Sequence, residues 1–209
     1  MLTGIFEDTE LLQEVLDDPK KIEQIAERSY AHDNGFLKIV IDEYDGKKIR
    51  LHVFPENREI PPAENWHNHR WPFASKILVG SIIHDIATFN SSDLGSYVKW
   101  AYTKMPDGTF SLLPTKDRFK MATKFTRTYV AGDQYQLPTG DIHRIIPTGE
   151  FTATMVRTEL ADSDVCFQWA QDTHDVGQNG ENQSKTPLTC SEVRGYIKSV
   201  LDKIGMEVI

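Results

Sequence analysis

Two histidines separated by one residue, His67 and His69, have the residue type and spacing to hold a metal ion. On an extended strand, side chains two residues apart point to the same side, so both imidazoles can face one ion. A lone pair of this kind occurs on many strands and is weak evidence by itself. A third ligand is needed before the pair predicts a metal site.

A third histidine, His143, follows a segment rich in turn residues. Its landmarks are Gly132, five residues, Pro138, one residue, Gly140, two residues and then His143. Proline fixes the backbone and glycine frees it, so this segment is expected to form a tight hairpin turn. His143 would then begin the strand that leaves the turn.

Together the two segments resemble the two motifs of the cupin superfamily, an H-x-H segment and a Gly-Pro-Gly-His segment. Gly80 also falls at the family's expected distance beyond His69. The resemblance covers residues 46 to 165. It implies an all-β cupin barrel (a double-stranded β-helix, or jelly roll) in which His67, His69 and His143 bind one divalent metal.

The sequence departs from the family pattern at Pro61, Pro147 and, with more consequence, Phe73. Phe73 stands where cupins usually have a metal-binding glutamate, and phenylalanine cannot bind a metal. The remaining three-histidine set is similar to that of thiol dioxygenases, although the cysteine that crosslinks to tyrosine in animal cysteine dioxygenases is absent. Imidazoles suit transition metals better than Mg²⁺ or Ca²⁺. Fe(II) is the expected cofactor, with Ni, Mn, Co, Cu or Zn as alternatives.

An ion held by neutral imidazoles alone keeps its full charge, which favours a small anionic substrate that carries a thiol or carboxylate, bound beside O2. Arg50 lies near the position of the carboxylate-binding arginine of thiol dioxygenases, and Arg157 is the second candidate. The alternation in residues 49–54 does not decide which face of that strand points inward. Trp71 and Phe73 are expected on the histidine side, as an apolar wall that excludes water.

His84 and Tyr129 are candidates to hydrogen-bond the ligands or to move a proton. With these residues, the leading prediction is a non-haem Fe(II) dioxygenase. One alternative is an isomerase or lyase that uses the ion as a Lewis acid. Another is a ligand-binding cupin without enzymatic activity, because one fold carries many functions.

The elements around these residues are predicted to be mostly short strands. Runs rich in β-branched and aromatic residues alternate with glycine and aspartate turns, which is typical of a β-sandwich or barrel. The runs are 36–41, 49–54, 75–89, 97–104, 110–113, 124–130, 142–146 and 151–159.

Helices are predicted at both ends of the chain. Apolar residues at helical spacing in residues 8–29 indicate two helices split at Asp18-Pro19, and a last helix is expected between Ser191 and Gly205. We expect a single domain that comprises a helical segment, the barrel, a flexible loop and a C-terminal helix, in residues 1–35, 36–170, 171–187 and 188–209.

The composition of the 209 residues excludes several partners. Acidic residues outnumber basic ones by 31 to 23, so a nucleic acid is an unexpected partner. No apolar stretch approaches the ~20 residues that cross a bilayer, and no signal peptide is apparent, so we expect no membrane contact and a cytoplasmic protein. The flanking helices could support a homodimer. Cys166 and Cys190 are expected to be buried or idle thiols.

Overall fold

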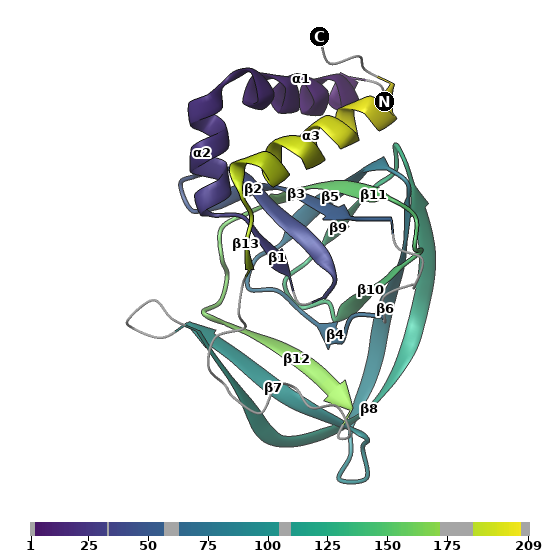
Figure 1. Cartoon of the computed structure of the whole chain (residues 1–209). Helices are drawn as coiled ribbons and strands as arrows, with labels where there is room; N and C mark the ends of the chain where they lie inside the picture. The colour runs from purple at the N-terminus through teal and green to yellow at the C-terminus, as the bar shows by residue number, and fades with distance from the viewer. Residues whose placement is uncertain (1–2, 33, 57–62, 105–109, 172–185, 206–209) are drawn as a thin grey trace.

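In the computed structural model, the described residues are 3–32, 34–56, 63–104, 110–171 and 186–205. Helices gather on one side of a strand-rich body (Figure 1). The helices are α1 (Thr3–Asp17), α2 (Pro19–Glu27) and α3 (Cys190–Ile204). The strands are β1 (Tyr30–His32), β2 (Phe36–Tyr44), β3 (Lys47–Phe54), β4 (Trp66–His67), β5 (Phe73–Val79), β6 (Ser81–Ser91), β7 (Tyr97–Lys104), β8 (Phe110–Val130), β9 (Gln134–Leu137), β10 (His143–Pro147), β11 (Thr152–Thr158), β12 (Val165–Gln171) and β13 (Thr186–Pro187).

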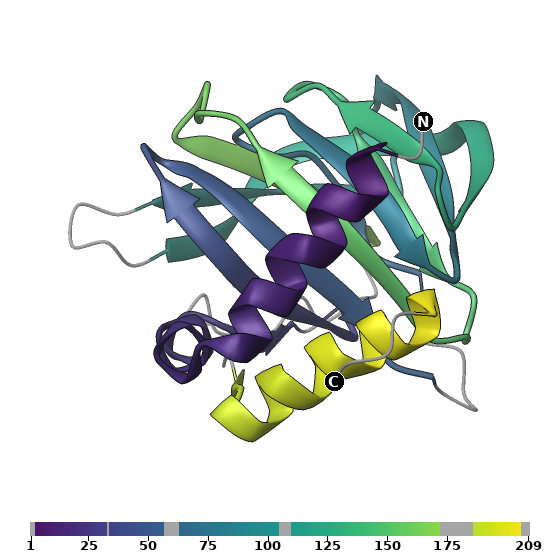
Figure 2. The ribbon, with the colours of Figure 1, turned by 90° about the horizontal axis from the view of Figure 1, so that it is seen from above.

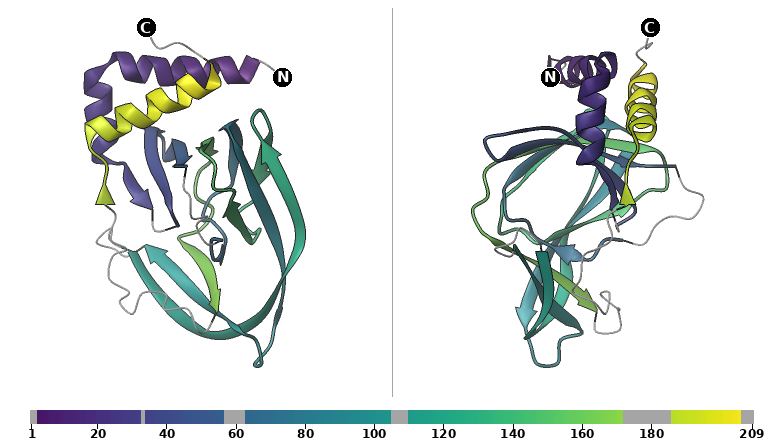
Figure 3. Two further views of the ribbon diagram at one scale, coloured as in Figure 1. Left: turned by 45° about the vertical axis from the view of Figure 1, so that its right-hand side comes forward. Right: turned by 60° about the vertical axis from the view of Figure 1, so that its left-hand side comes forward.

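The strands form two antiparallel sheets. The first sheet has the order β13-β1-β2-β3-β11-β5-β9, and the pairings of the second close into a ring, β10-β4-β12-β7-β8-β6. Seen from above, α1 and α3 lie over the first sheet (Figure 2), while β7 and β12 lie at the end far from the helices and the long strand β8 runs from that end up toward them (Figure 3). Two antiparallel sheets in a strand-dominated chain fit a cupin β-sandwich, a coarser description than the cupin barrel expected from the sequence.

The first sheet has one face against the helices. Leu51 and Val53 of β3 are fully buried there, in a core shared with all three helices. Ile25 of α2 and Ile197 of α3 belong to the same core. Burying an aliphatic side chain of this size contributes about 1.5–3 kcal/mol, so this face anchors the helices. The alternate residues of β3, including Arg50, must then lie on the opposite face.

The helix ends are set by capping side chains. Asp18 accepts a hydrogen bond from the Lys20 amide at 2.9 Å and caps α2, as the Asp18-Pro19 pair predicts. The expected cap of α3 at Ser191 is wrong, because Thr189, two residues earlier, is the N-cap and forms a capping box with Glu192. Gly205 ends α3 in the left-handed conformation, as expected.

Several strand predictions are corrected by the structure. Residues 75–89 contain parts of two strands, β5 and β6, and runs 110–113 and 124–130 belong to one long strand, β8. The expected hairpin before His143 is wrong. β9 pairs with β5 in the first sheet, whereas β10 pairs with β4 and β6 in the second, so the turn carries the chain between sheets. Of the expected flexible loop, 172–185 lie outside the described residues.

None of the described helices has the length and apolar character needed to span a membrane. Neither cysteine is in a disulfide; Cys166 is partly buried, whereas Cys190 is exposed.

The turn between β5 and β6 requires glycine. Gly80 has φ of 71°, and a Cβ there would lie 2.5 Å from the Phe151 carbonyl oxygen. We expect Gly80→Ala to lower the free energy of unfolding by about 1–3 kcal/mol, measured by denaturant titration. The matched control is Gly195→Ala inside α3, where a Cβ meets nothing within 4 Å and should stabilise by up to about 1 kcal/mol. Equal effects of the two substitutions would contradict this account of the turn.

Candidate metal centre

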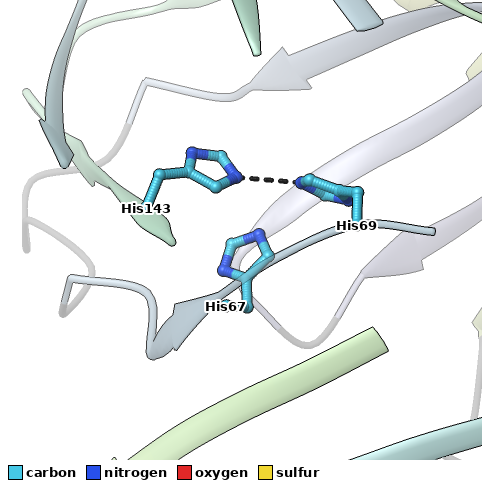
Figure 4. Close-up of side chains that lie close together, drawn as sticks. All are labelled: His67, His69 and His143. Carbon is cyan, nitrogen blue, oxygen red and sulfur yellow. Dashed lines mark hydrogen bonds between the residues drawn. The ribbon is translucent and has the colours of Figure 1, made fainter. Parts of the chain in front are cut away.

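Three histidine side chains converge beside the neighbouring strands β4 and β10 of the second sheet (Figure 4). His67 ends β4, His143 begins β10, and the two residues are direct neighbours in the antiparallel pair. The expected extended strand through both histidines ends at His67, and His69 lies in the irregular segment that follows β4. The three imidazoles nevertheless face one another, and one nitrogen from each lies within 4.8 Å of the others.

The donor set fits a transition metal. Imidazole nitrogens bind such ions at about 2.0–2.1 Å, so two of them at right angles are about 3 Å apart. The Nε2 atoms of His69 and His143 are 2.9 Å apart. Within the described residues, this cluster contains no carboxylate. The residues present can therefore hold an ion that prefers nitrogen ligands.

Hydrogen bonds to the other ring nitrogens orient two of the imidazoles. His67 Nδ1 donates to the Asn65 carbonyl oxygen at 2.9 Å, which leaves the lone pair on Nε2. His143 Nδ1 lies 2.9 Å from His84 Nε2, so His84 fixes the His143 ring from behind. A metal-bound imidazole commonly has such a partner, which sets both its tautomer and its orientation.

Burial favours the neutral forms of His69, His143 and His84. Desolvation, and then the neighbouring His67, lower the pKa of His69 and of His143 well below 6.5. Desolvation also lowers the pKa of His84 to about 4. Neutral imidazoles have lone pairs available, so a metal does not have to displace protons from these rings at neutral pH.

An ion pair on the opposite face of the second sheet fixes the strands that carry His84 and His143. Arg144 donates from Nε and Nη2 to Oδ2 of Asp85, at 3.0 and 2.8 Å, and Asp85 is only 3% exposed. Each residue follows one of the two histidines in sequence, and Arg144 and Asp85 are opposite each other in the β6–β10 pair. The Arg144 guanidinium also lies 4.2 Å from the centre of the Trp66 ring. This pair ties the register of β6 to that of β10.

A cavity of about 430 Å³ opens beside the histidines. Trp71 and Phe73 both line it, as expected, and the Phe73 ring centre is 5.0 Å from that of His69. Arg50 also lines it and is 8% exposed, and its guanidinium lies 4.9 Å from the centre of the Trp71 ring. The face of β3 that carries Arg50, and not the face that carries its neighbour Leu51, therefore points into the cavity.

The second arginine candidate lies elsewhere. Arg157 is exposed, pairs with the buried Asp8 of α1, and does not line the cavity. Its neighbour Val156 faces the cavity, so the alternation of β11 sends Arg157 to the helix side. The expected substrate-binding role of Arg157 has no support in this geometry.

The two candidates for proton transfer lie behind the cavity wall. Neither His84 nor Tyr129 lines the cavity. The Tyr129 ring centre is 6.0 Å from that of His84 and 4.8 Å from that of Tyr135, in a packed cluster. Direct contact between substrate and either residue is therefore unsupported, and the geometry gives His84 a positioning role through His143.

Sequence reasoning missed several lining residues. His52 shares the cavity face of β3 with Arg50, and its spacing of two would have identified it once that face was known. Glu64 is buried and accepts a hydrogen bond from the Ile145 amide at 3.0 Å, a long-range contact without a local signal. Cys166 also lines the cavity, and burial raises the pKa of its thiol to about 11.

Comparisons with known proteins leave the family unassigned. No family model matches the sequence, and no curated protein matches it.

Solved structures to which the chain is similar include an RmlC-like cupin from Shewanella frigidimarina, with 12% identity, a TM-score of 0.39, and coverage of 65% of this chain and 86% of that chain. Another is hydroquinone 1,2-dioxygenase PnpCD in complex with Cd²⁺ and 4-hydroxybenzonitrile, with 14% identity, a TM-score of 0.38, and coverage of 68% and 72%. KdgF from a Halomonas species has 9% identity, a TM-score of 0.37, and coverage of 64% and 89%. Likeness at this level assigns neither a family nor an activity to this chain.

The His84–His143 hydrogen bond gives a test of the metal centre. We expect His84→Phe to weaken Fe(II) or Co(II) binding by about 10–100-fold, because the His143 ring loses the partner that orients it. His84→Gln, which can still accept a hydrogen bond, should recover part of the affinity. The measurement is competition with a chromophoric chelator. Tyr129→Phe is the control, and equal losses in His84→Phe and Tyr129→Phe would contradict the positioning role.

Proposed function

We propose that this protein is a cupin-type, non-haem Fe(II) dioxygenase that acts on a small anionic substrate. One observation carries the proposal. Three imidazoles converge at the wall of a cavity that also holds a buried guanidinium, and among the described residues their cluster contains no carboxylate. A positively charged ion and a positively charged side chain facing the same cavity favour an anion between them.

His67, His69 and His143 would hold the ion, and Fe(II) bound there supplies electrons for the activation of O2 beside a coordinated substrate. The chain itself provides position and orientation. All three histidines line the cavity, so a small molecule in it would be able to reach an ion that they hold. Asn65 and His84 hold the rings of His67 and His143 from behind.

Arg50 would bind the anionic group of the substrate. Burial lowers the pKa of its guanidinium to about 10, so the group is charged at neutral pH. Its Nε is buried and makes no hydrogen bond. A buried donor without a partner costs about 1–3 kcal/mol, so an anion that meets Arg50 removes that penalty and gains a charge-assisted hydrogen bond.

Aromatic side chains would keep the reacting groups dry. Phe73 occupies space beside both His69 and His143, with ring centres at 5.0 and 6.1 Å. Trp71 lies between His69 and Arg50, in contact with the guanidinium. Excluding water from this wall strengthens the polar contacts that the substrate makes with Arg50.

Oxygen uptake tests the proposed activity. The Fe(II)-loaded protein should consume O2 with at least one compound from a panel of thiols, diketones and catechol-like acids, measured with an oxygen electrode. His143→Ala should remove both bound iron and oxygen uptake, since one of three ligands is lost.

If no compound in the panel causes oxygen uptake, the proposed dioxygenase activity is contradicted. Turnover without O2, supported equally by Mn or Zn, would instead identify a Lewis-acid isomerase or lyase. Ligand binding by protein that folds without metal and turns over nothing would identify a binding protein.

A further inference from the structure

The cavity beside the metal centre concentrates positive charge in an acidic protein. The chain has a formal net charge of −8. The basic residues that line the cavity are Arg28, Lys38, Lys48, Arg50 and Arg70. Among the described residues, the acidic ones that line it are Glu43 and Glu64. A hollow with excess positive charge attracts anions, and attracts multiply charged anions most strongly.

Both lining carboxylates already have partners. Glu43 forms an ion pair with Lys48 at 2.8 Å. Glu64 accepts hydrogen bonds from the Asn34 side-chain amide at 3.1 Å and from the Ile145 amide at 3.0 Å. Neither carboxylate is therefore placed as the partner of the Arg50 guanidinium.

Arg50 and His52 lie two residues apart on β3 and face the cavity together. Arg50 Nε and His52 Nε2 are both buried without a hydrogen-bond partner. Arg50 Nε is a donor, and His52 Nε2 is a donor in the tautomer that carries its proton there, so the two atoms form a site for an acceptor group that brings more than one oxygen atom.

Further positive charge surrounds this pair. Lys38 of β2 is directly opposite His52 in the antiparallel register. Arg70 and Arg50 lie over the same Trp71 ring, at 5.0 and 4.9 Å from its centre. Burial lowers the pKa of Arg50; Tyr30 and the charge of Glu43 oppose this shift, and the charge of Arg70 adds to it.

We propose that Arg50 and His52, flanked by Lys38 and Arg70, bind a dianionic oxyanion group of the phosphate monoester or phosphonate class. A phosphate monoester carries a charge of about −1.5 to −2 at neutral pH, and both kinds of group present three acceptor oxygens, which match a cluster of donors and cations better than a carboxylate does. The inference rests on the proposed function in one respect: the remainder of the phosphorylated or phosphonylated substrate extends along the cavity toward His67, His69 and His143.

The test uses metal-free protein, so it does not depend on catalysis. Isothermal titration calorimetry at neutral pH compares inorganic phosphate, methylphosphonate and acetate. We expect one phosphate or methylphosphonate to bind per chain. Each should bind at least about tenfold more tightly than acetate, a difference of about 1.4 kcal/mol in binding free energy. Arg50→Gln should weaken phosphate binding by about tenfold or more.

Matched variants keep the test decisive. Arg127→Gln is the control, because Arg127 is exposed on β8 and does not line the cavity. If Arg50→Gln fails to fold by circular dichroism, Arg50→Lys and His52→Phe carry the test, and each should weaken phosphate binding while Arg127→Gln does not. Phosphate that binds no more tightly than acetate, or binds equally to the cavity variants and the control, overturns the inference.

The phosphate-binding experiment and the oxygen-uptake experiment test two separate claims, the anion site and the dioxygenase activity. Phosphate binding that depends on Arg50, in a protein that consumes no O2 when loaded with iron, supports the anion site and contradicts the dioxygenase. Oxygen uptake by a protein whose metal-free form binds no phosphate contradicts the anion site and leaves the dioxygenase in place.

Discussion

The period of two in the strands of the first sheet is the constraint on which the rest of the structure depends. Along β3, Leu51 and Val53 enter the core beneath the helices, whereas Arg50 and His52 face the cavity. A slip of one residue in register would exchange the two sets, burying a guanidinium among aliphatic side chains. The apolar core therefore enforces the placement of the polar groups on the opposite face.

The second sheet contributes the histidines. β4 contains only two residues, so its position comes from its neighbours β10 and β12 and not from its own length. The Arg144–Asp85 pair ties β10 to β6, and β6 brings His84 behind His143. The candidate metal centre is thus attached to a closed ring of strands, while the candidate anion site is attached to a sheet stabilised by helices.

The sequence predicts what depends on local patterns. The histidine spacing and the turn residues before His143 predict the cluster, the Asp18-Pro19 pair predicts the break between α1 and α2, and Gly205 predicts the end of α3. It does not predict what depends on long-range pairing. Whether Arg50 or Arg157 faces the cavity is decided by the partners of β3 and β11, and the contact of Glu64 with Ile145 joins segments that are distant in sequence.

The central claim is that three imidazoles alone hold one iron ion. Crystals of the protein grown with Fe(II) under reducing conditions, measured on both sides of the iron absorption edge, test it most directly. The account predicts one anomalous peak per chain, within about 2.3 Å of a nitrogen of each of His67, His69 and His143 and without a carboxylate ligand from the protein. An iron peak elsewhere, or one bound by Glu64 or another carboxylate, would contradict it.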